Sequence, residues 1–152
     1  MLNTTLCYIE HDGAYLMLHR VKKVNDINHD KWIGIGGKFE ENETPEECVR
    51  REAAEETGLT LKGLRLRAVI TFLSDQYEGE YMYLFTASGY EGTLTSCDEG
   101  DLEWVPKEEI PFLPLWEGDH LFFEELARDR GFFTMKLRYE GDTLAEHELI
   151  LY

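Results

Sequence analysis

The stretch from Gly37 to Leu59 reads GKFEENETPEECVRREAAEETGL, and it decides the fold of the chain. Thr44 and Glu47 form a T-x-x-E capping box, with a proline between them that suits the first position of a helix. Gly58 suits the position just past the helix end, because glycine adopts the left-handed conformation without strain. The sequence therefore predicts a helix at about 45–57, entered through a glycine-containing loop.

Three glutamates crowd the last turns of this helix. Successive helical residues turn by about 100°, so Glu52 and Glu56 lie one turn apart on one face with Glu55 beside them. Like charges at these spacings, and acids near a helix C-terminus, both destabilise a helix. A hard cation would reverse that penalty, and magnesium typically takes one or two carboxylates together with phosphate oxygens. A solvated acidic face is the alternative explanation.

Length and composition predict a single domain spanning residues 1–152. A chain of 152 residues can bury a full core, and a hydrophobic content of 43% is typical of a globular protein. No apolar run approaches the roughly 18 residues of a membrane span, and the N-terminus lacks the features of a signal peptide. We therefore expect a cytoplasmic protein that does not bind membranes.

The charge of the chain restricts its partners. A formal net charge of −16 argues against binding polymeric nucleic acid, because that affinity comes largely from Lys and Arg neutralising phosphates. A phosphate-containing ligand would therefore need a divalent cation between itself and this protein. The three cysteines lie far apart, which favours reduced structural thiols over a zinc or redox pair.

The remaining segments alternate between strand and helix patterns. A first hairpin turns at Asp12-Gly13, and a second one, at the end of the chain, turns at Glu140-Gly141-Asp142. The expected elements are strands at 5–9, 15–18, 64–72 and 81–87, strand-like residues at 92–105, a Pro-punctuated connection at 106–114, a helix at 119–129, and strands at 132–139 and 143–151. This pattern predicts the α/β (α+β) fold class.

A polar loop from Val21 to Lys31 follows the first hairpin. Arg20, Lys22 and Lys23 are unusually close together for so acidic a chain. A basic patch beside an acidic metal site would bind the distal charges of a polyphosphate. An ordinary solvated loop is the alternative. Glu99, in a later polar turn, is either a further metal ligand or base, or a solvated acid.

The pattern Gly-x5-Glu-x7-Arg-Glu-x-x-Glu-Glu-x-Gly-Leu resembles the Nudix box of the MutT-related superfamily. Fixed identities at fixed spacing are much harder to match by chance than three glutamates on a helix, so they favour the metal site over the solvated face. Ala53 stands where a larger aliphatic residue is usual, a departure that affects packing behind the helix. The resemblance implies the Nudix fold, a mixed β-sheet sandwiched between helices in α/β/α layers.

The resemblance also implies a metal site and a set of residue roles. Glu52, Glu55, Glu56 and the Gly37 carbonyl would hold Mg²⁺, or Mn²⁺ as an alternative, with Glu99 as an extra ligand. A carboxylate would take a proton from water, and the hydroxide would displace in line at phosphorus. The base would be Glu52 or Glu56, with Glu99 as a further option. Arg51 would orient the carboxylates through an ion pair with Glu43 or Glu52. The phosphates would be bound by Arg20, Lys23 and Lys38.

Segments outside the box are similar to the nucleotide-pool-sanitising branch of the family. They are Lys31–Gly34, Gly36–Lys38, Asp98-Glu99 before Trp104, Ile110–Phe112, Trp116–Asp119 and the Gly141–Thr143 hairpin. The likeness implies hydrolysis of oxidised purine nucleoside triphosphates such as 8-oxo-dGTP to the monophosphate and pyrophosphate, a role in DNA repair. Ile33, Phe72, Trp116 and Asp119 would line the base pocket.

Two residues depart from the vertebrate-type enzymes of that branch. Ile33 stands where those enzymes carry an Asn that hydrogen-bonds the base, and Gly118 stands where they carry the first of two adjacent Asp residues. Base recognition must therefore differ here. A core aromatic beside a Pro-rich connection is the alternative for Trp116.

Several functions stay open at this point. The expected partner is a small nucleotide, and the substrate could instead be ADP-ribose, a dinucleotide or an ordinary nucleoside triphosphate. A catalytically silent nucleotide-sensing module is a different class, against which the intact set of Glu52, Glu55 and Glu56 argues. The sequence leaves the oligomeric state and the number of metal ions undetermined.

Overall fold

Helix α1 (Pro45–Thr57) has the bounds that the sequence predicts. The computed structural model describes all residues from 1 to 152. The Thr44 hydroxyl accepts a hydrogen bond from the Glu47 backbone N–H at 3.1 Å, and the Glu47 carboxylate accepts one from the Thr44 N–H at 3.0 Å. Gly58 ends the helix with φ of 78°. The capping box and the glycine stop are both confirmed.

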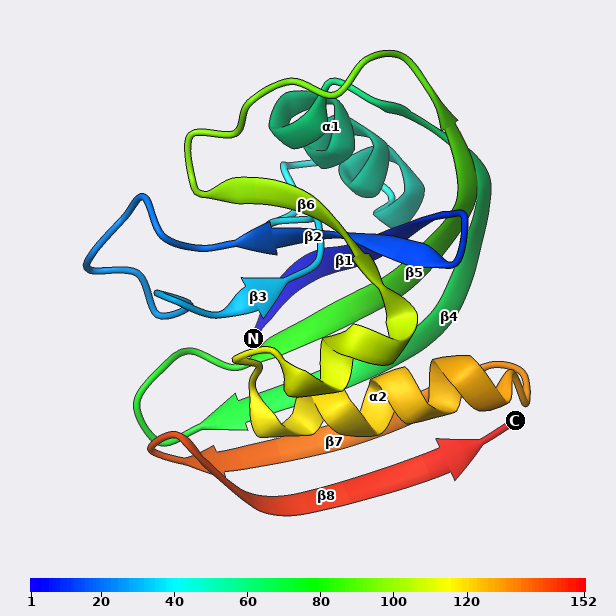
Figure 1. The fold of residues 1–152 in the computed structure, drawn as a ribbon. Coiled ribbons are helices and arrows are strands. Elements are labelled where there is room, and N and C mark those ends of the chain that lie inside the picture. Colours follow the sequence, from blue (N-terminus) through cyan, green and yellow to red (C-terminus); the bar gives the residue numbers. More distant parts are fainter.

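A mixed β-sheet forms the body of the protein (Figure 1). Its strands are β1 (Leu2–His11), β2 (Ala14–His19), β3 (Trp32–Ile33), β4 (Thr60–Ser74), β5 (Glu80–Glu91), β6 (Asp101–Pro106), β7 (Phe133–Glu140) and β8 (Thr143–Leu151). The order is β3-β2-β1-β5-β4-β7-β8, and β6 pairs with β2. The β1–β5 and β4–β7 pairs are parallel and the others antiparallel. The two expected hairpins, β1–β2 and β7–β8, are confirmed.

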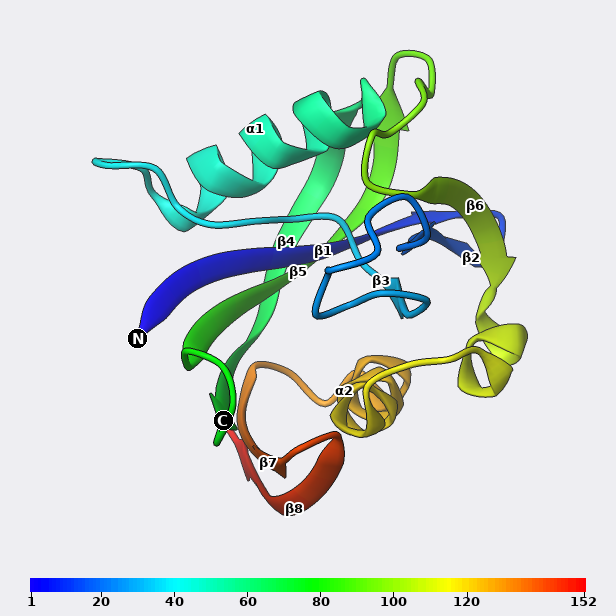
Figure 2. The same cartoon turned by 90° about the vertical axis from the view of Figure 1, so that its left-hand side faces the viewer.

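The two faces of the sheet are covered by different helices. Tyr8 of β1 belongs to one buried cluster together with Phe122 of α2 (Glu117–Arg128). Its neighbour Ile9 points to the opposite face and belongs to a second cluster, which contains Leu16 of β2 and Val49 of α1. Figure 2 shows α1 and α2 on opposite sides of β1. The expected layering of a mixed sheet between helices is therefore confirmed.

Two of the expected element bounds were wrong, and the Pro-punctuated connection contains a short helix. Residues 92–96 are exposed and form no strand, so the strand in this region is restricted to β6. The connection at 106–114 contains a 3₁₀ helix, η1 (Lys107–Phe112), with Pro111 inside it. Helix α2 begins at Glu117 rather than at residue 119.

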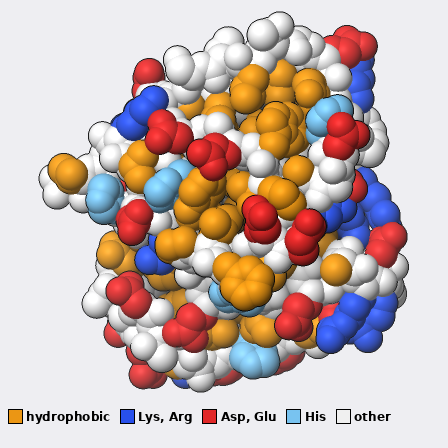
Figure 3. Space-filling model, in the orientation of Figure 1, with side chains coloured by type: hydrophobic (Ala, Val, Ile, Leu, Met, Phe, Trp, Pro, Cys, Tyr) orange, Lys and Arg blue, Asp and Glu red, His pale blue; other side chains and the backbone are white.

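The surface reflects the acidic composition. Acidic side chains are interspersed with hydrophobic and basic ones over the face drawn in Figure 3, and no continuous basic stripe crosses that face. All three cysteines are buried and free, as expected for structural thiols. None of the helices is both long enough and apolar enough to cross a membrane.

Candidate functional site

A cavity of about 770 Å³ has an acidic end, at Glu52 and Glu99, and an aromatic end, at Phe72 and Trp116. Its walls come from the loop after β2, the glycine loop before α1, and residues of β4, α2 and β7. Among the residues singled out by the sequence, the cavity lining brings together Arg20, Ile33, Gly37, Lys38, Arg51, Glu52, Phe72, Glu99, Trp116 and Asp119. Glu55, Glu56 and Lys23 lie outside this lining.

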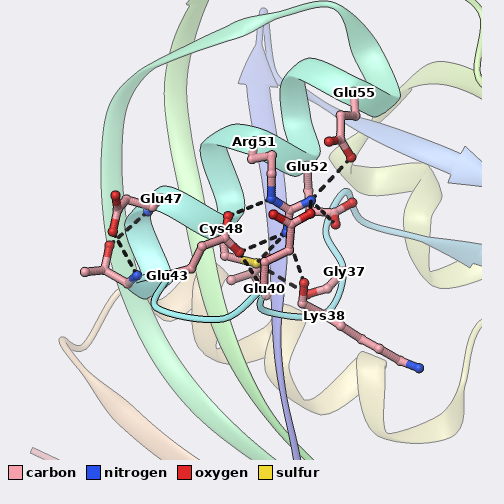
Figure 4. Close-up of polar contacts among 11 residues, drawn as sticks. Gly37, Lys38, Glu40, Glu43, Glu47, Cys48, Arg51, Glu52 and Glu55 are labelled. Atoms are coloured by element: carbon pink, nitrogen blue, oxygen red, sulfur yellow. Dashed lines mark hydrogen bonds and ion pairs between the residues drawn. The ribbon is translucent and has the colours of Figure 1, made fainter.

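Arg51 is the centre of the acidic end (Figure 4). Its Nε donates to Glu43 at 2.6 Å, and its Nη1 donates to Glu52 at 2.8 Å and to Glu55 at 3.3 Å. The hydrogen bond from Arg51 is the main reason why the pKa of Glu43 is lowered to about 2. Both ion pairs expected for Arg51 are present, so this guanidinium holds the carboxylates of Glu52 and Glu55 in place.

Glu56 is the most buried of the three glutamates, with 8% of its surface exposed. Its Oε1 lies 3.4 Å from the Gly36 backbone N–H. Burial raises the pKa of Glu56 well above its usual range, and the neighbouring carboxylates of Glu52 and Glu99 raise it further. A cation beside this group would offset the repulsion and favour its ionised form.

The glycine loop fits closely against α1. A Cβ on Gly37 would lie 2.6 Å from Cδ of Glu52, so any other residue here would displace that carboxylate. The Gly37 carbonyl accepts a hydrogen bond from the Thr5 N–H at 2.9 Å and faces the Cys48 thiol at 3.6 Å. A carbonyl oxygen beside clustered carboxylates is a donor set that suits Mg²⁺. In the arrangement observed, no three acidic, His or Cys side chains converge on a common point as they would around an ion.

Glu99 is delivered to the cavity from the loop before β6, where Arg20 binds it. Arg20 donates from Nη1 to Glu99 at 2.7 Å and from Nε to Asp26 at 2.6 Å. Lys23 Nζ lies 3.9 Å from the other oxygen of Glu99. Two of the basic residues expected to bind phosphate are therefore paired with the acid expected as an extra metal ligand. Asp26 was not among the residues expected at the site.

The opposite end of the cavity is an aromatic pocket. The ring of Trp116 meets Phe72 and Tyr139 edge-on, with centroids 5.9 Å and 5.1 Å away, and Lys31 Nζ lies 4.8 Å from its centroid. Asp119 is buried nearby, and burial raises its pKa to about 8 while the Lys31 charge opposes that rise. Burial thus favours the protonated form of this carboxyl, which can donate a hydrogen bond as well as accept one.

Tyr139 explains why position 118 is a glycine in this chain. The Gly118 N–H donates to the Tyr139 hydroxyl at 2.8 Å. A Cβ on Gly118 would lie 2.6 Å from Leu137 Cδ1 and 2.8 Å from that hydroxyl. An aspartate at this position would therefore collide with β7.

Asn28 is a cavity residue that sequence reasoning missed. Its Oδ1 accepts a hydrogen bond from the Trp116 indole N–H at 2.8 Å, and its backbone N–H lies 3.2 Å from Oδ1 of Asp26. The sequence offered a partial clue, because Asp and Asn two residues apart favour a local turn of this kind. The contact with Trp116 joins residues 88 positions apart and has no local sequence signature.

Comparisons with known proteins show a family match and similar relatives. The model of the NUDIX domain family matches residues 2–126. An oxidized purine nucleoside triphosphate hydrolase from Danio rerio is 35% identical over 124 residues, covering 78% of this chain and 77% of that protein.

Two bacterial proteins are similar over almost the whole chain. The uncharacterized Nudix hydrolase YvcI from Bacillus subtilis (strain 168) is 29% identical and covers 97% of this chain and 90% of its own length. The crystal structure of a mutator MutT protein from Bacillus halodurans superimposes with a TM-score of 0.87 at 27% identity, covering 98% of this chain and 97% of that one.

Proposed function

The chain belongs to the NUDIX domain family, and from this premise we propose that it is a Mg²⁺-dependent nucleoside triphosphate pyrophosphohydrolase acting on 8-oxo-dGTP or a related oxidised purine nucleotide. The observation that carries the proposal is the cavity that joins Arg51 and Glu52 of α1 to a pocket lined by Trp116, Phe72 and Asp119. Similarity to oxidized purine nucleoside triphosphate hydrolases from Danio rerio and Mus musculus supports the substrate class. The products would be the monophosphate and pyrophosphate, and the enzyme would cleanse the cytoplasmic nucleotide pool.

The acidic end of the cavity would hold the metal ion. Nudix hydrolases generally need a divalent metal, and the donors here are Glu52, Glu55, Glu56 and the Gly37 carbonyl, with Glu99 opposite. A bound Mg²⁺, or Mn²⁺, would neutralise phosphate charge and lower the pKa of a water molecule. Arg51 keeps the carboxylates oriented, as its hydrogen bonds to Glu52 and Glu55 indicate.

The reaction needs a proton acceptor and a set of cations for the phosphates. The attacking water forms a bond to phosphorus, its proton passes to a carboxylate, and the bond to the bridging oxygen breaks so that pyrophosphate leaves with the electron pair. Glu56 and Glu52 are the proposed acceptors, and Glu99 is a third. Arg20, Lys23 and Lys38 would bind the phosphate oxygens, the first after releasing Glu99.

The aromatic end of the cavity would bind the base. Rings of Trp116 and Phe72 offer apolar surface against which a purine can stack. The buried carboxyl of Asp119, whose raised pKa favours the protonated form, would supply a hydrogen bond to the base edge. Ile33 would contact the base only through its apolar surface.

A substrate panel with the purified protein tests this function. We expect Mg²⁺-dependent release of pyrophosphate from 8-oxo-dGTP with a kcat/KM above those for dGTP, 2-oxo-dATP, ADP-ribose and dinucleotides. Adding EDTA should abolish the release. Glu46→Gln, on the exposed side of the first turn of α1, is the matched control for loss of a carboxylate and should retain full activity.

Other results would replace this function with a different one. A wide preference for ADP-ribose or a dinucleotide would identify another Nudix substrate class. Nucleotide binding without hydrolysis of any member of the panel would identify a sensing module. Either result would overturn the proposal.

A further inference from the structure

The side-chain amide of Asn28 is held in one orientation. Its Oδ1 accepts the hydrogen bond of the Trp116 indole at 2.8 Å. An indole N–H can only donate, so the oxygen of the amide must face Trp116 and the Nδ2 group must face away from it. No hydrogen bond within the chain engages Nδ2.

The backbone around Asn28 is also fixed. Its N–H is directed at Oδ1 of Asp26, whose other oxygen binds Arg20 at 2.6 Å, and the Asp26 side chain is only 8% exposed. The Asn28 carbonyl accepts from the Lys31 N–H at 2.8 Å, and the Lys31 carbonyl accepts from the Arg20 N–H at 2.9 Å. The loop after β2 therefore presents the Asn28 amide as a preorganised group.

The other side-chain donors of the aromatic pocket are the hydroxyls of Tyr8 and Tyr139, which can rotate, and the carboxyl of Asp119, which can lose its proton, whereas the amide of Asn28 is fixed. Ile33 has no donor, although Asn28 and Ile33 line the same cavity. The indole N–H of Trp116 is already used by Asn28 itself. Asn28 lines the cavity, and its Nδ2 group is a hydrogen-bond donor without a partner within the chain.

We propose that Asn28 is a specificity-determining residue, whose Nδ2–H donates to a carbonyl oxygen on the edge of a purine base that stacks against Trp116. The proposal rests on the proposed function for the reaction that it serves. It assigns to the loop after β2 the hydrogen bond that Ile33 cannot make, and it favours purines with a keto oxygen over adenine.

The direction of this preference follows from the fixed orientation of the amide. Guanine presents the O6 acceptor on its edge, whereas adenine presents the N6 amino donor. The Asn28 amide cannot flip to offer its oxygen, because Trp116 would then lose its only acceptor. A donor facing a donor leaves both groups unpaired, which disfavours the adenine base.

Asn28→Asp tests this directly, because it keeps the shape and the acceptor for Trp116 but removes the donor. We expect the ratio of kcat/KM for 8-oxo-dGTP to that for dATP, measured with Mg²⁺, to fall about tenfold to a hundredfold. The change should be in KM more than in kcat. Asn28→Ala, which adds no charge, should lose the same selectivity. Comparing kcat/KM for dGTP, which carries only the C6 carbonyl oxygen, with that for 8-oxo-dATP, which carries only the C8 carbonyl oxygen, identifies the oxygen that accepts.

Asn25→Asp is the matched control. It adds the same charge to the same loop at an exposed position outside the cavity lining, and it should leave the ratio unchanged. Thermal unfolding of all variants verifies that each is folded. An Asn28→Asp ratio within twofold of wild type, or an equal loss on dATP and 8-oxo-dGTP, would overturn the role of Asn28.

Binding of monophosphates separates this role from the proposed function. Calorimetry without metal should show that wild type binds dGMP more tightly than dAMP and that Asn28→Asp does not distinguish them. Wild-type protein that hydrolyses no purine triphosphate would overturn the proposed function, and the monophosphate titration would still decide the role of Asn28. Equal affinity of wild type for dGMP and dAMP would contradict it.

Discussion

The carboxylates of α1, of which Glu52 lines the cavity, and the aromatic pocket around Trp116 are assembled differently. Glu52, Glu55 and Glu56 come from one helix, and Arg51 of the same helix orients two of them. The pocket draws its walls from β4, α2, β7 and the loop after β2. Local sequence thus determines the proposed chemistry, whereas packing between distant segments determines the proposed choice of base.

The largest effect is expected at the carboxylates. Glu56→Gln keeps the shape of the side chain but removes a metal ligand and proton acceptor, so kcat should fall by about 10²–10⁴-fold. Discrimination between oxidised and normal purines should stay as in wild type, because the pocket is untouched. Steady-state kinetics on a folded variant verifies this, and wild-type hydrolysis by Glu56→Gln would remove this residue from the mechanism.

A smaller effect, on KM, is expected in the pocket. Trp116→Leu removes the surface on which the base would stack, an interaction worth about 1–3 kcal/mol per base, so KM should rise about tenfold or more with kcat nearly kept. Trp104→Leu is the control, since this indole stacks on Tyr90 outside the cavity lining. An unchanged KM for Trp116→Leu would indicate that Trp116 serves only to pack the core.

Gly118→Asp tests how closely the pocket is packed. The new side chain would meet Leu137 and the Tyr139 hydroxyl, and overpacking of this kind typically costs about 1–3 kcal/mol. Urea unfolding should show that loss of stability. The double variant Gly118→Asp/Tyr139→Phe should recover part of it, because the hydroxyl is removed. Full stability of Gly118→Asp alone would mean that β7 can move away.

Asp119 should make the free energy of unfolding depend on pH in a range where exposed carboxylates have no effect. Its folded pKa of about 8 lies above the ordinary value of 3.8, so between these values the folded state holds a proton that the unfolded state has lost. Stability contributed by this group is therefore present at low pH and lost as the pH rises toward 8. Lys31 lowers the pKa of Asp119, and the hydroxyls of Tyr8 and Tyr139 lie near enough to feel its charge.

Asp119→Asn removes that titration. We expect the unfolding free energy of the variant, relative to that of wild type, to increase by about 1 kcal/mol or more as the pH rises from 4 to 8. Each unit of pKa shift corresponds to about 1.4 kcal/mol. Urea unfolding at several pH values measures the difference. Parallel curves for the two proteins would show that Asp119 is ionised in the folded state throughout.

The same contrast explains what the sequence could predict. Helix α1 follows from Thr44, Glu47 and Gly58, because capping and glycine stops act within a few residues of the helix. The spacing of Glu52, Glu55 and Glu56 on one face follows from helix geometry alone. These parts of the fold need no knowledge of distant contacts.

The pocket could be predicted only in part. A resemblance indicated Trp116 and Asp119, but the hydrogen bond of Trp116 to Asn28 and the fit of Gly118 against Tyr139 arise from the meeting of distant segments. Residues 92–96 were expected to be strand-like, yet they are exposed and form no strand, because β2 pairs with Asp101–Pro106 and not with this segment. Local patterns carry no information on such pairings.

The division of labour is tested most directly by one ratio, kcat/KM for 8-oxo-dGTP over that for dATP, measured in wild type, Glu56→Gln and Trp116→Leu. We expect Glu56→Gln to keep the wild-type ratio while its kcat falls. We expect Trp116→Leu to lose much of the ratio, because Asn28 loses the partner that fixes its amide, while the kcat of this variant stays within several-fold of wild type. A Trp116→Leu protein with an unchanged ratio, or a Glu56→Gln protein with wild-type kcat, would contradict the division.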